Sequence, residues 1–199
     1  MTMTVFLIFG FLNWRISSSA DFDNDGLVDT YVPQTYNIEY AHSLLFKNKG
    51  NFRFEDVGNG IRVIDSYAGA FADLNNDGRQ DLVVSGRLKS NAEPSLRVYK
   101  NISQNSNNFI KFKLLGEQSG TYPVGAQIRI KHKNGIFVRQ FEGNTGTLNQ
   151  QNDPIIHFGL GRNVEIQSVQ VVWPSGIKQN LKSHQFLKNS VNLITEFNQ

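Results

Sequence analysis

The sequence predicts an all-β protein with two copies of one repeat, followed by a small antiparallel β-domain. Alternating and β-branched runs bounded by Gly, Asn and Ser are frequent, while long segments of helical periodicity are missing. One Asp-rich loop occurs at 21–29 and again at 73–81, which is 52 residues later. From about residue 107 the repeat gives way to short strands separated by Gly- and Pro-containing turns. We therefore divide the chain into residues 1–16, 17–106 and 107–199.

Residues 1–16 contain an apolar run, 5–12, that is too short to span a bilayer, so we expect no stable membrane span. The run has the length of a signal-peptide core, and residues 18–20 (Ser-Ser-Ala) resemble a cleavage site, although no Lys or Arg precedes the run. Residues 5–20 also occupy the place that residues 57–72 hold in the next repeat, which favours an inner strand. Both interpretations stay open.

The two Asp-rich loops have the spacing of a cation site. Each places oxygen side chains at loop positions 1, 3, 5 and 9 and glycine at position 6, where a sharp turn is needed. Calcium is the ion that such hard oxygen ligands favour, with the carbonyl of position 7 as a further ligand. The predicted ligands are Asp21, Asp23, Asp25, the Leu27 carbonyl and Asp29 in the first loop, and Asp73, Asn75, Asp77, the Arg79 carbonyl and Asp81 in the second.

Two alternatives bear on these loops. Asp, Asn and Gly also form ordinary metal-free turns, but a chance turn has no reason to recur with the same ligand spacing. An EF-hand needs a bidentate Glu at position 12, where this chain has Val32 and Val84. The first loop carries four carboxylates and the second carries three and an amide, so we expect the first to depend more on the metal.

The flanks of the loops repeat as well. Short apolar runs at 30–32 and 82–84 follow the loops, and both read as strands. Ser43–Asn48 is echoed by Ser95–Asn101. A whole supersecondary unit is therefore repeated in residues 17–106.

The last part of the chain predicts a compact set of hairpins. Strands are expected at 109–115, 127–131, 169–172 and 191–196. Residues 173–176 (Trp-Pro-Ser-Gly) predict a tight turn with the tryptophan packed beneath it.

The net charge of +3 is unevenly divided. Residues 1–100 hold 12 acidic and 10 basic side chains, whereas residues 101–199 hold 5 and 10. The basic side chains of the second half alternate along strands, which favours a solvated sheet face over a nucleic-acid surface, with acidic glycans as a minority hypothesis. These side chains are Lys111, Lys113, Arg129, Lys131 and Lys133.

At this point the chain resembles a known family. "ADFDNDGLVD" and "ADLNNDGRQD" are similar to FG-GAP or VCBS-type repeats, whose blades build calcium-binding β-propellers, and "VGAQIRI", "HFGLG" and "VQVVWPSGIKQNL" are similar to the ASPIC/UnbV domain. This order is that of the cartilage-acidic-protein-1-like family, over about residues 17–197. The resemblance implies a partial propeller and a secreted, periplasmic or cell-surface protein that binds calcium and an unknown protein or glycan partner in adhesion or another interaction.

Two blades are fewer than the four to eight of a closed propeller, and their sheet edges would be open. We expect the chain to be a fragment of a longer protein, or its blades to be completed by self-association or by packing on the C-terminal domain.

The sequence favours a non-enzymatic protein. Its four histidines have no metal-site spacing, Ser175 lacks the glycine of a nucleophile elbow two residues before it, and no phosphate loop occurs. Cysteine is absent, which excludes a disulfide framework or a thiolate zinc site. The alternative is an enzyme or biosynthetic accessory acting on an extracellular glycan or small molecule, with its site around His157 and Trp173.

Overall fold

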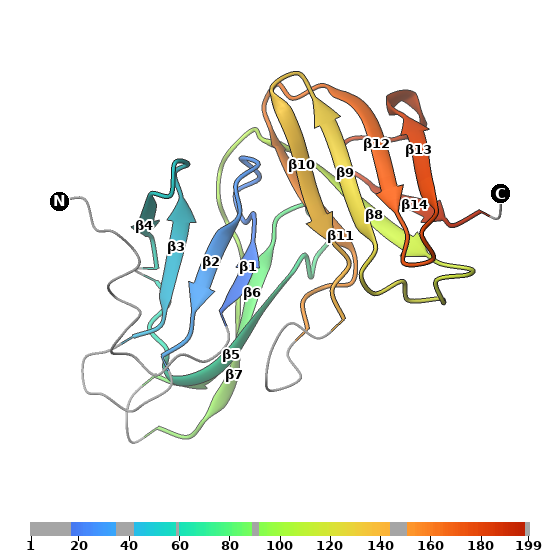
Figure 1. The fold of residues 1–199 in the computed structure, drawn as a ribbon. Coiled ribbons are helices and arrows are strands. Elements are labelled where there is room, and N and C mark those ends of the chain that lie inside the picture. The colour runs from blue at the N-terminus through green and yellow to red at the C-terminus, as the bar shows by residue number, and fades with distance from the viewer. Residues whose placement is uncertain (1–16, 35–41, 59, 89–91, 144–150, 198–199) are drawn as a thin grey trace.

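The computed structural model describes residues 17–34, 42–58, 60–88, 92–143 and 151–197, which form strands and almost no helix (Figure 1). The first seven strands are β1 (Ser18–Ala20), β2 (Asp29–Val32), β3 (Leu44–Asn48), β4 (Phe54–Asp56), β5 (Ile64–Ala72), β6 (Asp81–Arg87) and β7 (Ser95–Tyr99). The others are β8 (Asn108–Leu115), β9 (Gln127–His132), β10 (Gly135–Gln140), β11 (Ile156–Gly161), β12 (Ile166–Val172), β13 (Lys178–Lys182) and β14 (Val191–Thr195), with the short 3₁₀ helix η2 (Ser183–Gln185) before the last. The all-β prediction is confirmed, while the expected segment 1–16 lies outside the described residues.

The repeat appears as two antiparallel sheets, which we call the first blade (β1–β4) and the second blade (β5–β7). In each blade an Asp-rich loop connects the first two strands. The strands predicted at 30–32 and 82–84 are confirmed as parts of β2 and β6. The second blade has three described strands, because β8 joins a sheet of the C-terminal domain instead. None of the described sheets is closed, so the blades remain a partial propeller.

The two blades pack against each other through Tyr31 of β2. Its side chain is fully buried and lies on Gly69 of β5, where an added Cβ would be 2.5 Å from the ring. The Tyr31 hydroxyl also lies 3.1 Å from Ser66 Oγ. Phe71 and Leu82 belong to the same core. The close approach of the blades therefore depends on the missing side chain at position 69.

The C-terminal domain has two sheets, with strand orders β10-β9-β12-β13 and β11-β8-β14. Both sheets contribute to one core, which includes Ile110, Phe112, Ile128, Phe158, Val169 and Trp173. The β8–β14 pair is parallel, whereas the other described pairs are antiparallel. This differs from the wholly antiparallel domain that was expected. The first and last strands of the domain lie side by side and run in the same direction, so no hairpin links them.

The predicted turn at 173–176 is part of this core. Trp173 is buried, and its Nε1 donates to Gln179 Oε1 at 2.9 Å. The Ser175 hydroxyl donates to Glu196 Oε1 at 2.5 Å. Burial raises the pKa of Glu196, but hydrogen bonds from Ser175, Ser119 and Glu117 outweigh it and lower this pKa to about 2. Ser175 and Glu196 thus hold the turn against the last strand.

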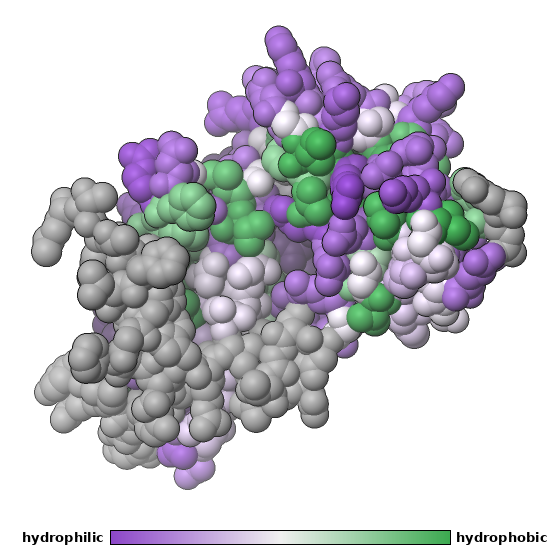
Figure 2. Space-filling view, viewed as in Figure 1, coloured by the Kyte–Doolittle hydropathy of each residue, from purple (hydrophilic) through white to green (hydrophobic). Residues whose placement is uncertain are grey.

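The predicted basic sheet face is correct for most of its members and wrong for Lys111. Lys113, Arg129 and Lys131 are exposed, and hydrophilic side chains gather over the C-terminal domain in Figure 2. Lys111 is only 3% exposed, because the second Asp-rich loop covers it.

Within the described part of the chain, no helix has the length and hydrophobicity to cross a bilayer.

Candidate metal centre

The first Asp-rich loop is folded around the carboxylate of Asp21. Its Oδ1 accepts the N–H of Asp25 at 3.0 Å, and its Oδ2 accepts the N–H of Gly26 at 2.9 Å. The chain turns this sharply because Asn24 and Gly26 adopt left-handed φ angles of 61° and 94°, which asparagine and glycine tolerate best. The carboxylate of Asp21, at loop position 1, therefore holds the first half of the loop through these two hydrogen bonds.

Asp29 begins β2 and closes the loop from the other side. It is fully buried, and it accepts the N–H of Phe22 at 3.1 Å and the N–H of Asn48 at 2.8 Å. Asn48, at the end of β3, also donates from Nδ2 to the Val28 carbonyl at 3.0 Å. The sequence repeats Asn48 of the first unit as Asn101 of the second, but it does not indicate what these residues do. The structure shows that this residue fastens β3 to the loop.

The second loop repeats the arrangement. Asp73 accepts the N–H groups of loop positions 5 and 6 at 3.0 and 2.7 Å. Asp81 accepts the N–H of Leu74 at 3.2 Å and that of Asn101 at 2.8 Å. The repeat seen in the sequence is thus a repeat of hydrogen-bond geometry.

Three carboxylates of the first loop come together. Asp21, Asp23 and Asp29 each offer one oxygen, and these oxygens lie within 4.8 Å of one another. Asp23 Oδ1 is buried and has no hydrogen-bond partner among the described residues. Burial raises the pKa of Asp21 to about 7, with a further contribution from the Asp25 charge, and burial raises that of Asp29 to about 8. Carboxylates buried together are costly without a cation, so the cluster fits a hard divalent ion.

The protein itself supplies little positive charge to the first loop. Among the described residues, Lys47 forms the ion pairs of this loop: its ammonium pairs with Asp23 and lies 3.4 Å from Asp25 Oδ2. Burial raises the pKa of Asp21 and outweighs the charge of Arg139, which acts on Asp21 and lowers this pKa. Lys47 is partly exposed, and a single ammonium does not balance the four aspartates when all of them are ionised.

The second loop is much closer to neutral. Its three aspartates have two cationic partners, since Lys111 of β8 pairs with Asp73 and Arg79 lies 2.6 Å from Asp77 Oδ2. The Lys111–Asp73 pair is almost completely buried. The expected difference in metal dependence between the loops therefore has a second cause, which the sequence did not indicate.

The remaining predicted ligands lie in the more exposed part of each loop. Asp25 accepts the N–H of Leu27 at 2.9 Å, and Asp77 accepts the N–H of Arg79 at 3.0 Å. Asn75 donates from Nδ2 to Asp77 Oδ2 at 2.9 Å. Ligation by the carbonyls of Leu27 and Arg79 stays a prediction.

The C-terminal domain packs directly on the first loop. An added Cβ on Gly159 of β11 would overlap the Asp21 carboxylate and lie 2.5 Å from Asn24 Cα. The Gly161 N–H donates to the Asn24 carbonyl at 2.7 Å, and His157 Nε2 lies 2.6 Å from Asn24 Oδ1. The glycines of the "HFGLG" segment thus permit the strand to lie against the loop.

The two loops also contact each other. Asn24 donates from Nδ2 to the Gly78 carbonyl at 2.9 Å, and Asn101 donates from Nδ2 to the Phe22 carbonyl at 2.6 Å. We call the contact of both loops with β8 and β11 the loop junction. A cation in the first loop would lie where the blades meet the C-terminal domain.

Comparison with known proteins gives matches in both parts of the chain. Residues 18–84 match the family described as FG-GAP-like repeat, and residues 116–191 match the family described as ASPIC and UnbV. Cartilage acidic protein 1 of Xenopus tropicalis is 34% identical over 176 residues, which cover 81% of this chain and 26% of that protein. The chain thus spans about a quarter of the length of this relative.

Proposed function

The chain belongs to the cartilage-acidic-protein-1-like family, with FG-GAP-like repeats before an ASPIC/UnbV domain, and on this premise we propose that it is a calcium-stabilised, non-enzymatic interaction module. We place it outside the cell, as a secreted, periplasmic or surface protein that binds a protein or glycan partner. Extracellular calcium modules have dissociation constants of about 10⁻⁴–10⁻³ M, so calcium at about 10⁻³ M would fill at least half of the sites.

One observation carries the calcium proposal, namely the buried carboxylate cluster of the first loop. Asp21, Asp23 and Asp29 would hold the ion, with Asp25 and the Leu27 carbonyl as further oxygen ligands. A bound Ca²⁺ would supply the positive charge that Lys47 alone does not. In the second loop the ligands would be Asp73, Asn75, Asp77, the Arg79 carbonyl and Asp81, where we expect weaker binding because Lys111 already neutralises Asp73.

The side chains that an enzymatic site around His157 and Trp173 would use are engaged in structural contacts, which supports the non-enzymatic part of the proposal. The Ser175 hydroxyl donates a hydrogen bond to Glu196, and the Trp173 side chain is buried in the hydrophobic core, so neither is free for a substrate. His157 lines a cavity, but its Nε2 is hydrogen-bonded to Asn24. We therefore do not favour the enzymatic alternative at this place.

Thermal melts of the metal-stripped chain, with and without millimolar calcium, test the calcium proposal. The isosteric variants Asp23→Asn and Asp77→Asn form a matched pair, since they change loop positions 3 and 5 of different loops by one charge each. We expect calcium to raise the melting temperature of the parent chain and of Asp77→Asn, and to raise that of Asp23→Asn much less. Equal gains in both variants, or no gain in the parent chain, would contradict the proposal.

A further inference from the structure

Strand β14 forms an open edge of the C-terminal domain. It is the last strand of the sheet β11-β8-β14, and no other described strand pairs with its outer side (Figure 1). The Lys111 N–H donates to the Ser190 carbonyl at 3.0 Å, and the Glu196 N–H donates to the Leu115 carbonyl at 2.9 Å. Alternate residues of a parallel strand bond its neighbour, so the even-numbered residues of β14 face β8. The N–H and C=O groups of the odd-numbered residues therefore point to the open edge, and these residues are Val191, Leu193 and Thr195.

The side chains of the same strand form an apolar strip on the outer face of the sheet. Leu193 is 63% exposed and Val191 is 45% exposed. Leu115, from the neighbouring strand β8, is 37% exposed on the same face. Leu187 lies beside the strand, because the Asn192 side chain bonds both its N–H and its carbonyl at 2.9 Å, and its own side chain is exposed.

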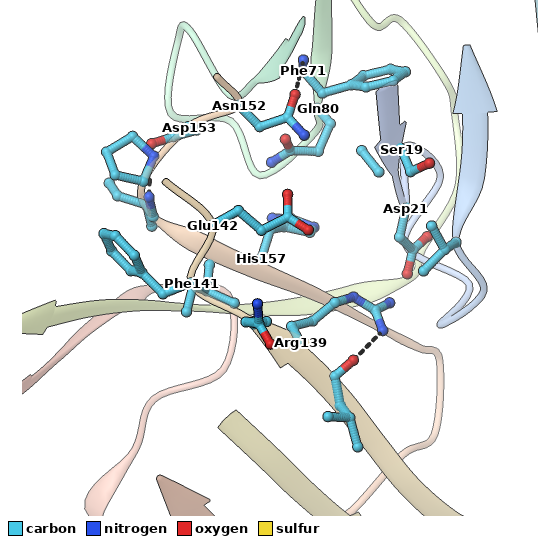
Figure 3. A pocket seen from close by; sticks show the side chains of 17 residues that line it. Ser19, Asp21, Phe71, Gln80, Arg139, Phe141, Glu142, Asn152, Asp153 and His157 are labelled. Atoms are coloured by element: carbon cyan, nitrogen blue, oxygen red, sulfur yellow. Dashed lines mark hydrogen bonds between the residues drawn. The ribbon is translucent and has the colours of Figure 1, made fainter. Parts of the chain in front are cut away.

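The Asp-rich loops cover the rest of this face but not the strip. On β11, His157 lines a cavity together with Asp21 of the first loop (Figure 3). On β8, Lys111 pairs with Asp73 of the second loop, whereas Lys113 is already exposed. The strip therefore begins where the loop junction ends, and it holds none of the predicted calcium ligands.

The lack of charge distinguishes β14 from the other edges of the described sheets. Edge strands that face water commonly carry charged residues, which oppose pairing with another chain. The edge strands β4, β5, β7, β10 and β13 each contain at least one Asp, Glu, Lys or Arg. Strands β1 and β11 contain none, but β1 lies against β5, and the Gly161 N–H of β11 is bonded to the first loop. An uncharged edge that is also uncovered is thus found at β14.

Two-fold pairing with a second copy would satisfy this edge. With Leu193 opposite Leu193 of the second copy in antiparallel register, Val191 of each copy lies opposite Thr195 of the other, and these residues exchange their N–H and C=O groups. The Thr195 carbonyl also accepts from Gln179 Nε2 at 3.3 Å, which leaves its second lone pair for the partner. The Lys113 side chains of the two copies would start three strand spacings apart, about 14 Å, which exceeds the Debye length of about 10 Å at 0.1 M salt.

We propose that β14 is a self-association edge, through which two copies of this chain pair in antiparallel register about Leu193. The occupant is a second copy because the alternating, uncharged edge is complementary to itself and offers no charge that would select another partner. The pairing goes beyond the calcium-stabilised module and does not rest on it. One pair of short strands is a small interface, so we expect a weak dimer with a dissociation constant of about 10⁻⁵–10⁻⁴ M.

Sedimentation velocity of the full chain, with calcium in excess and from about 10⁻⁶ to 10⁻³ M protein, tests the pairing. Leu193→Lys would place like charges opposite each other at the centre of the interface and should weaken the dimer by about tenfold or more. Leu96→Lys is the matched control, because Leu96 is a similarly exposed leucine on the edge strand β7, and this change should leave the dimer intact. A chain that stays monomeric at about 10⁻³ M, a dimer that Leu193→Lys leaves unchanged, or one that Leu96→Lys weakens equally would overturn the proposal.

Amide hydrogen exchange of the parent chain, followed by NMR, tests the register without any substitution. The amides of Val191, Leu193 and Thr195 should exchange more slowly as the protein concentration rises. Those of Asn192 and Ile194 already bond β8 and should be protected at every concentration. Exchange at the three odd-numbered amides that does not change between monomer and dimer would also overturn the proposal, even if Leu193→Lys fails to fold.

Discussion

Calcium binding to the first loop should release protons, and the number released depends on pH. In the metal-free protein the pKa of Asp21 is about 7 and that of Asp29 about 8, compared with 3.8 for an ordinary aspartate. Both groups are therefore protonated at pH 6, and calcium needs both of them ionised. Binding should release about two protons at pH 6 and almost none at about pH 9, so the affinity should rise with pH through this window.

The same shifts set the pH dependence of the metal-free fold. A carboxylate whose pKa is raised on folding holds a proton that the unfolded chain releases, so its stabilisation is greatest below about pH 4. This stabilisation is lost as the pH rises through 7 and 8. Calcium should reverse the trend, because it stabilises the ionised form. The metal-free chain should thus melt at a lower temperature at pH 8 than at pH 6, and calcium should protect it more at pH 8.

Calorimetry at pH 6, in two buffers of different ionisation enthalpy, measures the proton release directly. The difference in the observed heats gives the number of protons that each bound calcium displaces. Asp29→Asn removes one titrating group and should lower the number to about one, whereas Asp77→Asn in the second loop should leave it unchanged. A binding heat that does not depend on the buffer would refute the assignment of calcium to the Asp21–Asp29 cluster.

Three further predictions concern stability. Gly159→Ala should lower the free energy of unfolding by about 1–3 kcal/mol, because the added Cβ would overlap the first loop. Gly60→Ala is the neutral control in urea unfolding, since no atom lies within 4 Å of its Cβ, and equal unfolding midpoints of the two variants would count against close docking of β11. Lys111→Met should lower the stability of the metal-free chain by about 3–5 kcal/mol, because it leaves Asp73 buried and unpaired. Calcium should raise the melting temperature of this variant more than that of the parent chain, and an equal rise would argue against Lys111 as a substitute for the cation. Glu196→Gln should cost about 1–3 kcal/mol. It should also remove the part of the acid destabilisation that comes from protonating Glu196 as the pH falls from about 4.5 toward 2, and an unchanged acid profile would contradict the role of this carboxylate.

The parts of this structure that sequence reasoning predicts are those governed by near neighbours. The Asp spacing and the glycine of each loop predict the turn, since the contacts of Asp21 and Asp73 reach only four or five residues along the chain. Strands β2, β6 and β8 follow from short apolar or alternating runs. These patterns are local, so they predict the turns and strands without knowledge of the tertiary arrangement.

The parts that could not be predicted depend on which distant segments meet. Alternation along β8 places Lys111 and Lys113 on one face, but it does not say that a loop covers only the first. His157 and Asn24 are 133 residues apart, so their contact has no local signal. The same holds for Gly159, which reads as an ordinary strand glycine until the first loop is placed beside it. A buried ion pair or close backbone approach needs the tertiary arrangement.

We propose above all that the first loop is a divalent-cation site at the loop junction. Calcium titration by calorimetry at pH 8, on the metal-stripped parent chain and on Asp23→Asn, tests it most directly. We predict saturable binding to the parent chain with a dissociation constant of about 10⁻⁴–10⁻³ M or tighter, and loss of the tighter site in Asp23→Asn. A folded parent chain that gives no binding heat, or an Asp23→Asn variant that binds as the parent does, would contradict the claim.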